Sequence, residues 1–284
     1  MTAVHALTPA RTEAILADAK APLLARLWEA ALGDATDPDE GLFPALTRAP
    51  MAPIPGLPRA ERAAAVSSPP PLLRGNGDYG PTLARAASRT GLPAAALAAV
   101  IDAEAGKRRD GSWDPAARNP RSSATGLGQF LDRTWIGEAE RRGTHLHALA
   151  SSRGWLDPRG RVRADVRDDL LALRADPATA IEAVADYAKA GLSRLESAGV
   201  KIGSDARQVA SLAWLGHHLG PVEALRFVQG RIEPARAKLL LSAQVGASEA
   251  ARRISAAAGD AVAAHRQWLT GYIGRVIQRS AGRL

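Results

Sequence analysis

The chain has 284 residues, no cysteine and a formal net charge of +8 at pH 7. Its length is sufficient for a sizeable core in one or two domains, and the lack of cysteine excludes disulfide bonds and thiolate metal sites. Alanine and leucine are abundant, and aromatic residues make up only 4% of the chain. This composition predicts an all-α protein, and no run of 18 apolar residues predicts a membrane span.

The N-terminal region differs from the rest of the chain in charge and in proline content. Residues 7–32 are predicted to form an amphipathic helix, and the Pro-rich stretch from Pro50 to Pro71 predicts a linker. Up to Pro58, four basic residues face seven acidic ones, a net charge of −3, so the remainder carries +11. We therefore expect an N-terminal helix plus linker over residues 1–75 and a helical domain over 76–284. The apolar stripe on residues 7–32 serves either internal packing or the docking of a partner.

A second helical stripe ends in one carboxylate. Leu97, Val100, Ile101 and Glu104 follow the spacing of one helix face, with Pro93 suited to the start of the helix and Gly106 to its end. Desolvation on the apolar face should raise the pKa of Glu104 toward the range where it can donate a proton. The alternative is a surface glutamate in a helix whose apolar stripe ends at Ile101.

The segment after this helix is a predicted loop region. Trp113-Asp114-Pro115 and Asn119-Pro120 are typical of turns. Gly126 and Gly128 are expected to let the backbone approach a ligand without obstruction by a Cβ atom. Gln129 offers a donor and an acceptor suited to the hydroxyl and N-acetyl groups of a sugar.

Further helices are predicted along the rest of the chain. Residues 176–195 form one of them, where Tyr187 either braces a carboxylate or a sugar in a cleft or is a core aromatic residue. Residues 204–219 form another, ended by Gly220-Pro221. Glu233–Arg279 is expected to form two helices, broken near Val245-Gly246 or Gly259-Asp260. The pairs His145/His147 and His217/His218 lack a carboxylate or cysteine cluster at ligand spacing, so we expect no metal site, and His217 is a candidate cleft residue.

The loop segment and its flanking helices resemble a known family. Glu104, Trp113-Asp114-Pro115, the stretch from Ser123 to Phe130 and Thr134-Trp135 follow the order of the catalytic motif of the soluble lytic transglycosylases, which share the lysozyme-like fold with goose-type lysozymes. Tyr79–Pro93 and Ser211–Pro221 resemble the family more weakly, so the likeness covers residues 78–230, the core of the predicted domain. Three features depart from the family pattern: Ala105 in place of Ser or Thr, an insertion at residues 106–111, and Trp214 in place of Tyr.

The resemblance implies a lysozyme-like helical catalytic domain with an N-terminal helical extension. It implies a phage-type peptidoglycan-degrading enzyme without a cofactor, with Glu104 as the general acid and base. The substrate-binding residues that it implies are Gly126, Leu127, Gly128, Gln129, Phe130, Tyr187, Trp214 and His217.

The implied reaction is lytic transglycosylation, which cleaves the MurNAc-β-1,4-GlcNAc bond and leaves a 1,6-anhydroMurNAc end. One alternative is a hydrolytic muramidase in which Asp110 or Asp114 aids a water molecule. Another is an inactive wall-binding component of a phage tail or secretion apparatus. The net positive charge of the chain after Pro58 suits an anionic wall polymer, whereas the scattered Arg residues do not predict nucleic-acid binding.

The expected location follows from the first residues and the expected substrate. The first 20 residues show no basic segment followed by an apolar core, so we expect no signal peptide. We therefore expect action in the periplasm or cell wall after export through a phage-type or dedicated route. The N-terminal region is the expected contact for a phage tail, lysis or secretion component.

Overall fold

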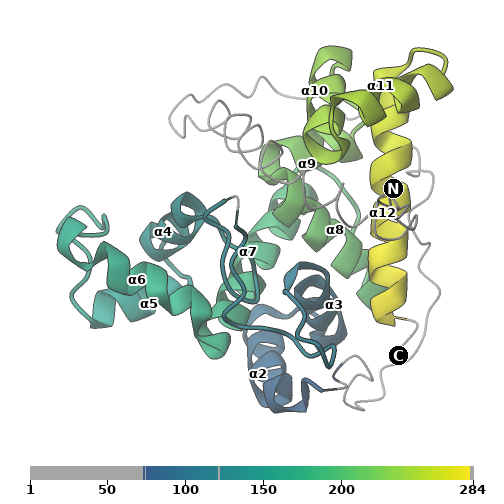
Figure 1. Cartoon of the computed structure of the whole chain (residues 1–284). Helices are drawn as coiled ribbons and strands as arrows, with labels where there is room; N and C mark the ends of the chain where they lie inside the picture. Colours follow the sequence, from purple (N-terminus) through teal and green to yellow (C-terminus); the bar gives the residue numbers. More distant parts are fainter. Residues whose placement is uncertain (1–72, 74, 121, 282–284) are drawn as a thin grey trace, which may run out of the picture. The chain divides into compact units, whose positions relative to one another are not determined.

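The computed structural model describes residues 73, 75–120 and 122–281, and these residues form helices and loops without a β-strand (Figure 1). The predicted all-α fold is confirmed. None of the described helices is both long enough and apolar enough to cross a membrane. In chain order the α-helices are α2 (Gly80–Thr90), α3 (Ala94–Glu104), α4 (Asp132–Glu140), α5 (His145–Ser152), α6 (Arg167–Ala172), α7 (Pro177–Ser197), α8 (Ala206–Leu219), α9 (Pro221–Val228), α10 (Pro234–Val245), α11 (Ala247–Ala256) and α12 (Ala261–Ala281). Short 3-10 helices are η2 (Gly77–Tyr79), η3 (Ala164–Val166) and η4 (Leu173–Ala175).

The described residues group into two compact units. The larger unit contains residues 73, 75–119, 123–231 and 269–281, and the smaller one contains residues 120, 122 and 232–268. The predicted N-terminal helix and linker, residues 1–75, lie outside the described residues except for residues 73 and 75.

Helix α3 lies at the centre of the larger unit and packs against α2, α7 and α8. The predicted stripe residues Leu97, Val100 and Ile101 are all buried, and so are the alanines at positions 96, 98 and 99. The helix is therefore buried almost all round and not on one face only, because alanine lets neighbouring helices approach closely on every side. Pro93 precedes the first helical residue with an extended backbone, and Ala105 returns the chain to that conformation at the other end.

Helices α7 and α8 begin as the sequence predicts. The carboxylate of Asp176 accepts a hydrogen bond from the backbone N–H of Thr179, and Asp205 accepts from Arg207 and Gln208 in the same way. Such caps satisfy N–H groups that have no partner within the helix. The two helices pack against each other, and α7 also packs against α2. Helices α4, α5 and α6 gather beside them, with α5 in contact with α7 (Figure 1).

Residues 105–120 and 122–131, which we call the meander, lie between α3 and α4 in the chain, and these described residues form no helix. Three isolated antiparallel bridges hold the meander: Lys107 with Trp113, Arg118 with Thr125, and Thr125 with Phe130. The meander follows Glu104 directly, so its path decides what surrounds that carboxylate.

The C-terminal region corrects one prediction from the sequence. Residues 233–279 were expected to form two helices with a break at one of two places, but they form α10, α11 and α12, with breaks at both. Each break has a glycine with positive φ, Gly246 at +84° and Gly259 at +87°, a conformation that glycine adopts without steric cost. In the smaller unit, Leu241, Ala250 and Ala264 form the buried core.

Candidate active site at the end of helix α3

Glu104 is the last residue of α3. Burial is the main influence on its carboxyl group and raises the pKa of Glu104, whereas the charges of His217 and Lys107 and the indole N–H of Trp214 lower it less. The residue as a whole keeps part of its surface open to solvent. The carboxyl group of Glu104 thus keeps its proton to a higher pH than an ordinary glutamate does, and the residue remains accessible from the solvent.

Trp214, on α8, brings a buried polar group to this carboxyl. Its indole Nε1 is buried and has no partner at full hydrogen-bond geometry, yet it lies near enough to lower the pKa of Glu104. The ring is fixed by stacking on His218, with centroids 4.4 Å apart, and by contact with Tyr272 at 5.2 Å. Its side chain is therefore positioned to act on Glu104 through the N–H and is not exposed to a ligand.

Three of the predicted binding residues form a ring cluster. Phe130 of the meander, Tyr187 of α7 and His217 of α8 meet edge to face, with centroid distances of 5.1, 5.5 and 5.7 Å. Tyr187 and His217 are half-buried, whereas Phe130 is fully buried. Because His217 also acts electrostatically on Glu104, the cluster adjoins the glutamate.

The proton of Tyr187 is held firmly. Burial, with a smaller contribution from the charge of Glu138, raises the pKa of Tyr187 to about 12. The phenol therefore remains a hydrogen-bond donor throughout the physiological pH range.

The Gly126–Phe130 segment packs against its own chain more than the sequence indicated. A Cβ atom on Gly126, where φ is +78°, would lie 1.8 Å from the carbonyl oxygen of Arg174. One on Gly128 would lie 2.7 Å from Cγ2 of Val184. The chain's own packing against residues 174 and 184 therefore accounts for glycine at both positions, and an approach of a ligand to this backbone stays a prediction.

Leu127 and Gln129 also serve the meander itself. The side chain of Leu127 is fully buried. The amide Nε2 of Gln129 donates to the backbone oxygen of Gly126 at 2.8 Å and to that of Ala117 at 3.3 Å. The donor group of the amide, which was expected to reach a sugar, is thus used within the protein, so the amide fixes the shape of the meander.

Sequence reasoning missed Arg174, which fastens the meander to the helices. The guanidinium Nη1 donates to the backbone oxygens of Ser123 at 2.6 Å and Phe130 at 3.0 Å. The same nitrogen lies 2.6 Å from Asp132 Oδ1. These partners are more than 40 residues away in sequence, so no local pattern indicated them; the apolar neighbours of Arg174 were the one available sign that it is buried.

Glu138 on α4 was also missed. Burial raises the pKa of Glu138, and an ion pair with Arg141 at 2.5 Å opposes this shift. Its charge acts on both Tyr187 and His217. Glu138 therefore adjoins the ring cluster from α4.

The other carboxylates near Glu104 in sequence are engaged elsewhere. Asp102 accepts a hydrogen bond from Trp113 Nε1 at 2.8 Å and pairs with Lys107 at 3.2 Å. Asp110 accepts from the backbone and hydroxyl of Ser112, and Asp114 accepts from the backbone N–H of Ala116. No acidic residue is among the groups that shift the pKa of Glu104.

The histidine pairs make contacts within the larger unit. His147 Nδ1 contacts the backbone oxygen of Ala139 at 2.8 Å, and His217 and His218 belong to different ring contacts. Among the described residues, no group of three or more His, Asp or Glu side chains is arranged to hold a metal ion.

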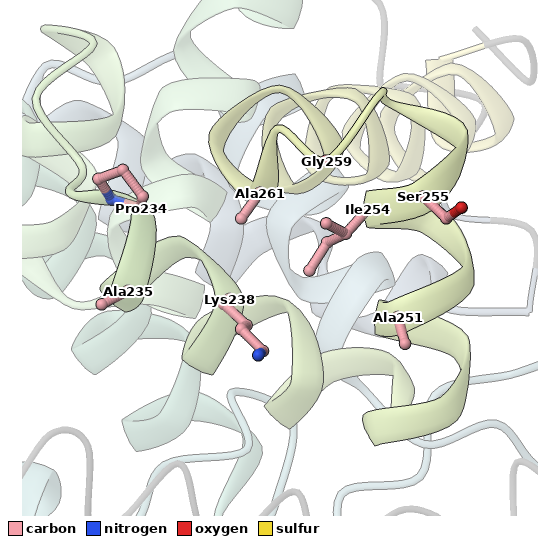
Figure 2. Close-up of a pocket in the computed structure, with 8 residues that line it drawn as sticks. All are labelled: Pro234, Ala235, Lys238, Ala251, Ile254, Ser255, Gly259 and Ala261. Atoms are coloured by element: carbon pink, nitrogen blue, oxygen red, sulfur yellow. The ribbon is translucent and has the colours of Figure 1, made fainter.

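A cavity of about 500 Å³ lies in the smaller unit, where its walls come from α10, α11 and the start of α12 (Figure 2). None of the residues around Glu104 lines it. Its lining residues are Pro234, Ala235, Lys238, Ala251, Ile254, Ser255, Gly259 and Ala261.

Comparison with known proteins gives no match to a protein-family model, to a curated protein or to a solved structure. The functional assignment therefore depends on the chemistry around Glu104 and on the resemblance of the motifs.

Proposed function

We propose that this protein is a peptidoglycan lytic transglycosylase that cleaves the MurNAc-β-1,4-GlcNAc bond, with Glu104 as general acid and then general base. The observation that carries the proposal is a single carboxyl group of raised pKa at a helix end, without an acidic residue acting on it. The motif resemblance over residues 78–230 and the all-helical fold support it.

The number of carboxylates at the site distinguishes lytic transglycosylation from hydrolysis. Hydrolysis of a glycosidic bond ordinarily uses a pair of carboxylates, one as acid and one as nucleophile or base. Asp110 is fixed in its turn by Ser112, and Asp114 is held by the backbone of Ala116. Because neither carboxylate is among the groups that act on Glu104, a reaction with an internal nucleophile fits this site better.

The proposed reaction balances with Glu104 alone. Protonated Glu104 gives its proton to the bridging oxygen as the C1–O4 bond breaks, which releases GlcNAc with a free 4-hydroxyl. The C6 hydroxyl of the same MurNAc then attacks C1 and yields its proton to the Glu104 carboxylate. A C1–O6 bond forms, no water is consumed, and the acid is regenerated; the internal attack gains from proximity.

The surrounding residues have distinct parts in this proposal. The N–H of Trp214 stabilises the carboxylate form of Glu104 between the two steps, because it favours the charged state. Tyr187 and His217, half-buried in the ring cluster, offer polar atoms to the bound sugar. The meander, held by Gln129 and Arg174, contributes its shape and backbone.

Digestion of purified sacculi tests the proposal. Wild type should release muropeptides with 1,6-anhydroMurNAc ends, detected by mass spectrometry, and Glu104→Gln should release none. Glu196→Gln, an exposed change on α7, is the matched control and should behave as wild type. Reducing ends from wild type would identify a muramidase instead, and sacculi that are bound but uncut would identify a wall-binding module.

A further inference from the structure

Residues 106–114, which we call the cationic turn, form a tight reversal of the chain shortly after Glu104. Lys107 and Trp113 are bridged. The N–H of Arg108 donates to Ser112 O at 2.8 Å, and that of Gly111 donates to Arg108 O at 3.0 Å. At the open end the N–H of Asp114 donates to Gly106 O at 2.8 Å.

The cationic turn is anchored to the body of the larger unit through Trp113. This side chain is fully buried, stacks on Tyr79 with centroids 5.6 Å apart, and donates through Nε1 to Asp102 at 2.8 Å. Its backbone N–H donates to Asn76 Oδ1 at 2.8 Å. The turn is thus a preorganised structure, which lowers the entropic cost of binding a ligand.

Lys107 ties the cationic turn to the end of α3. Its Nζ donates to the backbone oxygens of Asp102 at 2.6 Å and Ala105 at 3.0 Å. Its charge also lowers the pKa of Glu104. The turn therefore starts within electrostatic reach of the proposed acid.

The exposed charge of the cationic turn is positive. Lys107, Arg108, Arg109 and Asp110 are all exposed, so three positive charges stand against one negative charge. The carboxylate of Asp110 points back to its own turn, where it accepts hydrogen bonds from the backbone and hydroxyl of Ser112. Arg108 lies 3.8 Å from Asp114, a loose ion pair. The guanidinium of Arg109 makes no hydrogen bond or ion pair with any residue in the described part of the chain.

We propose that the cationic turn binds carboxylates of the peptide stems on the glycan strand, and this inference rests on the function proposed above. A guanidinium binds a carboxylate through two parallel hydrogen bonds, a geometry that lysine does not match. The stem is attached to the MurNAc whose bridging glycosidic oxygen Glu104 protonates in the proposed reaction. Because Trp113 is buried, the turn offers no exposed indole on which a nucleic-acid base would stack.

The length of a peptide stem agrees with the distance between Glu104 and the arginines of the cationic turn. Arg109 follows Glu104 by five residues, so their Cα atoms lie within about 18 Å of each other. An extended tetrapeptide stem reaches about 14 Å from its attachment point, and an Arg side chain covers the remaining few ångströms. A carboxylate along the stem can therefore meet Arg108 or Arg109 while the sugar lies at Glu104.

The test compares two forms of the same soluble glycan strands. One form carries intact stems, and in the other the stem carboxylates are converted to methylamides. The variant is the double substitution Arg108→Gln/Arg109→Gln, with Arg159→Gln/Arg167→Gln, two exposed arginines elsewhere, as the control of equal charge change. Anhydro product formation gives kcat and KM for each pair.

We expect KM on intact strands to rise about ten-fold in the double variant, as for the loss of one charge-assisted hydrogen bond at a wet surface. On the methylamide strands, the double variant and wild type should have equal KM, and kcat should be unchanged throughout. An equal loss on both substrates, or no loss on either, would overturn this inference alone. If wild type cleaves neither form of the strands, the proposed function is overturned instead.

Discussion

The substitution Gly126→Ala tests how the meander is held beside Glu104. The added methyl would lie 1.8 Å from Arg174 O, in a backbone conformation with φ of +78°. That conformation alone costs about 1 kcal/mol for alanine. The meander would also have to retreat by about 1 Å in a close-packed region. Such a shift weakens the hydrogen bonds from Arg174 to Ser123 and Phe130, worth about 1.5–3 kcal/mol each.

We therefore expect Gly126→Ala to lower the free energy of unfolding by about 3–5 kcal/mol. Urea unfolding followed by tryptophan fluorescence measures it, because Trp113, Trp135 and Trp214 are all buried. Gly143→Ala is the matched control: φ there is +85° with no atom within 4 Å of the new Cβ, so only the conformational cost of about 1 kcal/mol applies. Equal losses for the two variants would refute the close approach of Arg174 to the meander.

Three further predictions concern pH. Glu104→Gln should be more stable than wild type at neutral pH. Burial raises the pKa of Glu104, so wild type loses stability as the pH rises from the pKa of Glu104 in the unfolded chain to its pKa in the folded protein. Urea unfolding midpoints of the two proteins across this pH range measure the difference. Burial lowers the pKa of His265 to about 4, so stability of about 3 kcal/mol should be lost as pH falls from about 6.5 to about 4; His265→Gln should flatten that acid limb, and an unchanged limb would assign it to other groups. Trp214→Phe should raise the pKa of Glu104 further and move the alkaline limb of the activity profile to higher pH; Trp135→Phe, which loses a hydrogen bond to Leu170 instead, should leave the limb in place.

The sequence was sufficient to predict α3, α7 and α8 and the direction in which the pKa of Glu104 is shifted. Capping residues such as Asp176 mark where helices begin, and the spacing from Leu97 to Glu104 places the carboxyl on a buried helix. The direction of the pKa shift follows from that burial alone, and the structure confirms it.

The function of the loop residues could not be predicted in the same way. Gln129 carries two donors that suit a sugar equally well as a backbone carbonyl, and only the folded path of the chain shows that Gly126 and Ala117 take them. Arg174 contacts residues 44 and 51 positions away. Its role therefore depends on tertiary structure that no local pattern contains.

The central claim is that the internal C6 hydroxyl, and not water, attacks C1 after Glu104 protonates the leaving group. Digestion of sacculi in water enriched in ¹⁸O, with mass spectrometry of the released muropeptides, measures this directly. We predict anhydro products without ¹⁸O at C1, formed by wild type and absent with Glu104→Gln. Reducing ends that carry ¹⁸O would contradict the claim and show that this site directs water to the sugar.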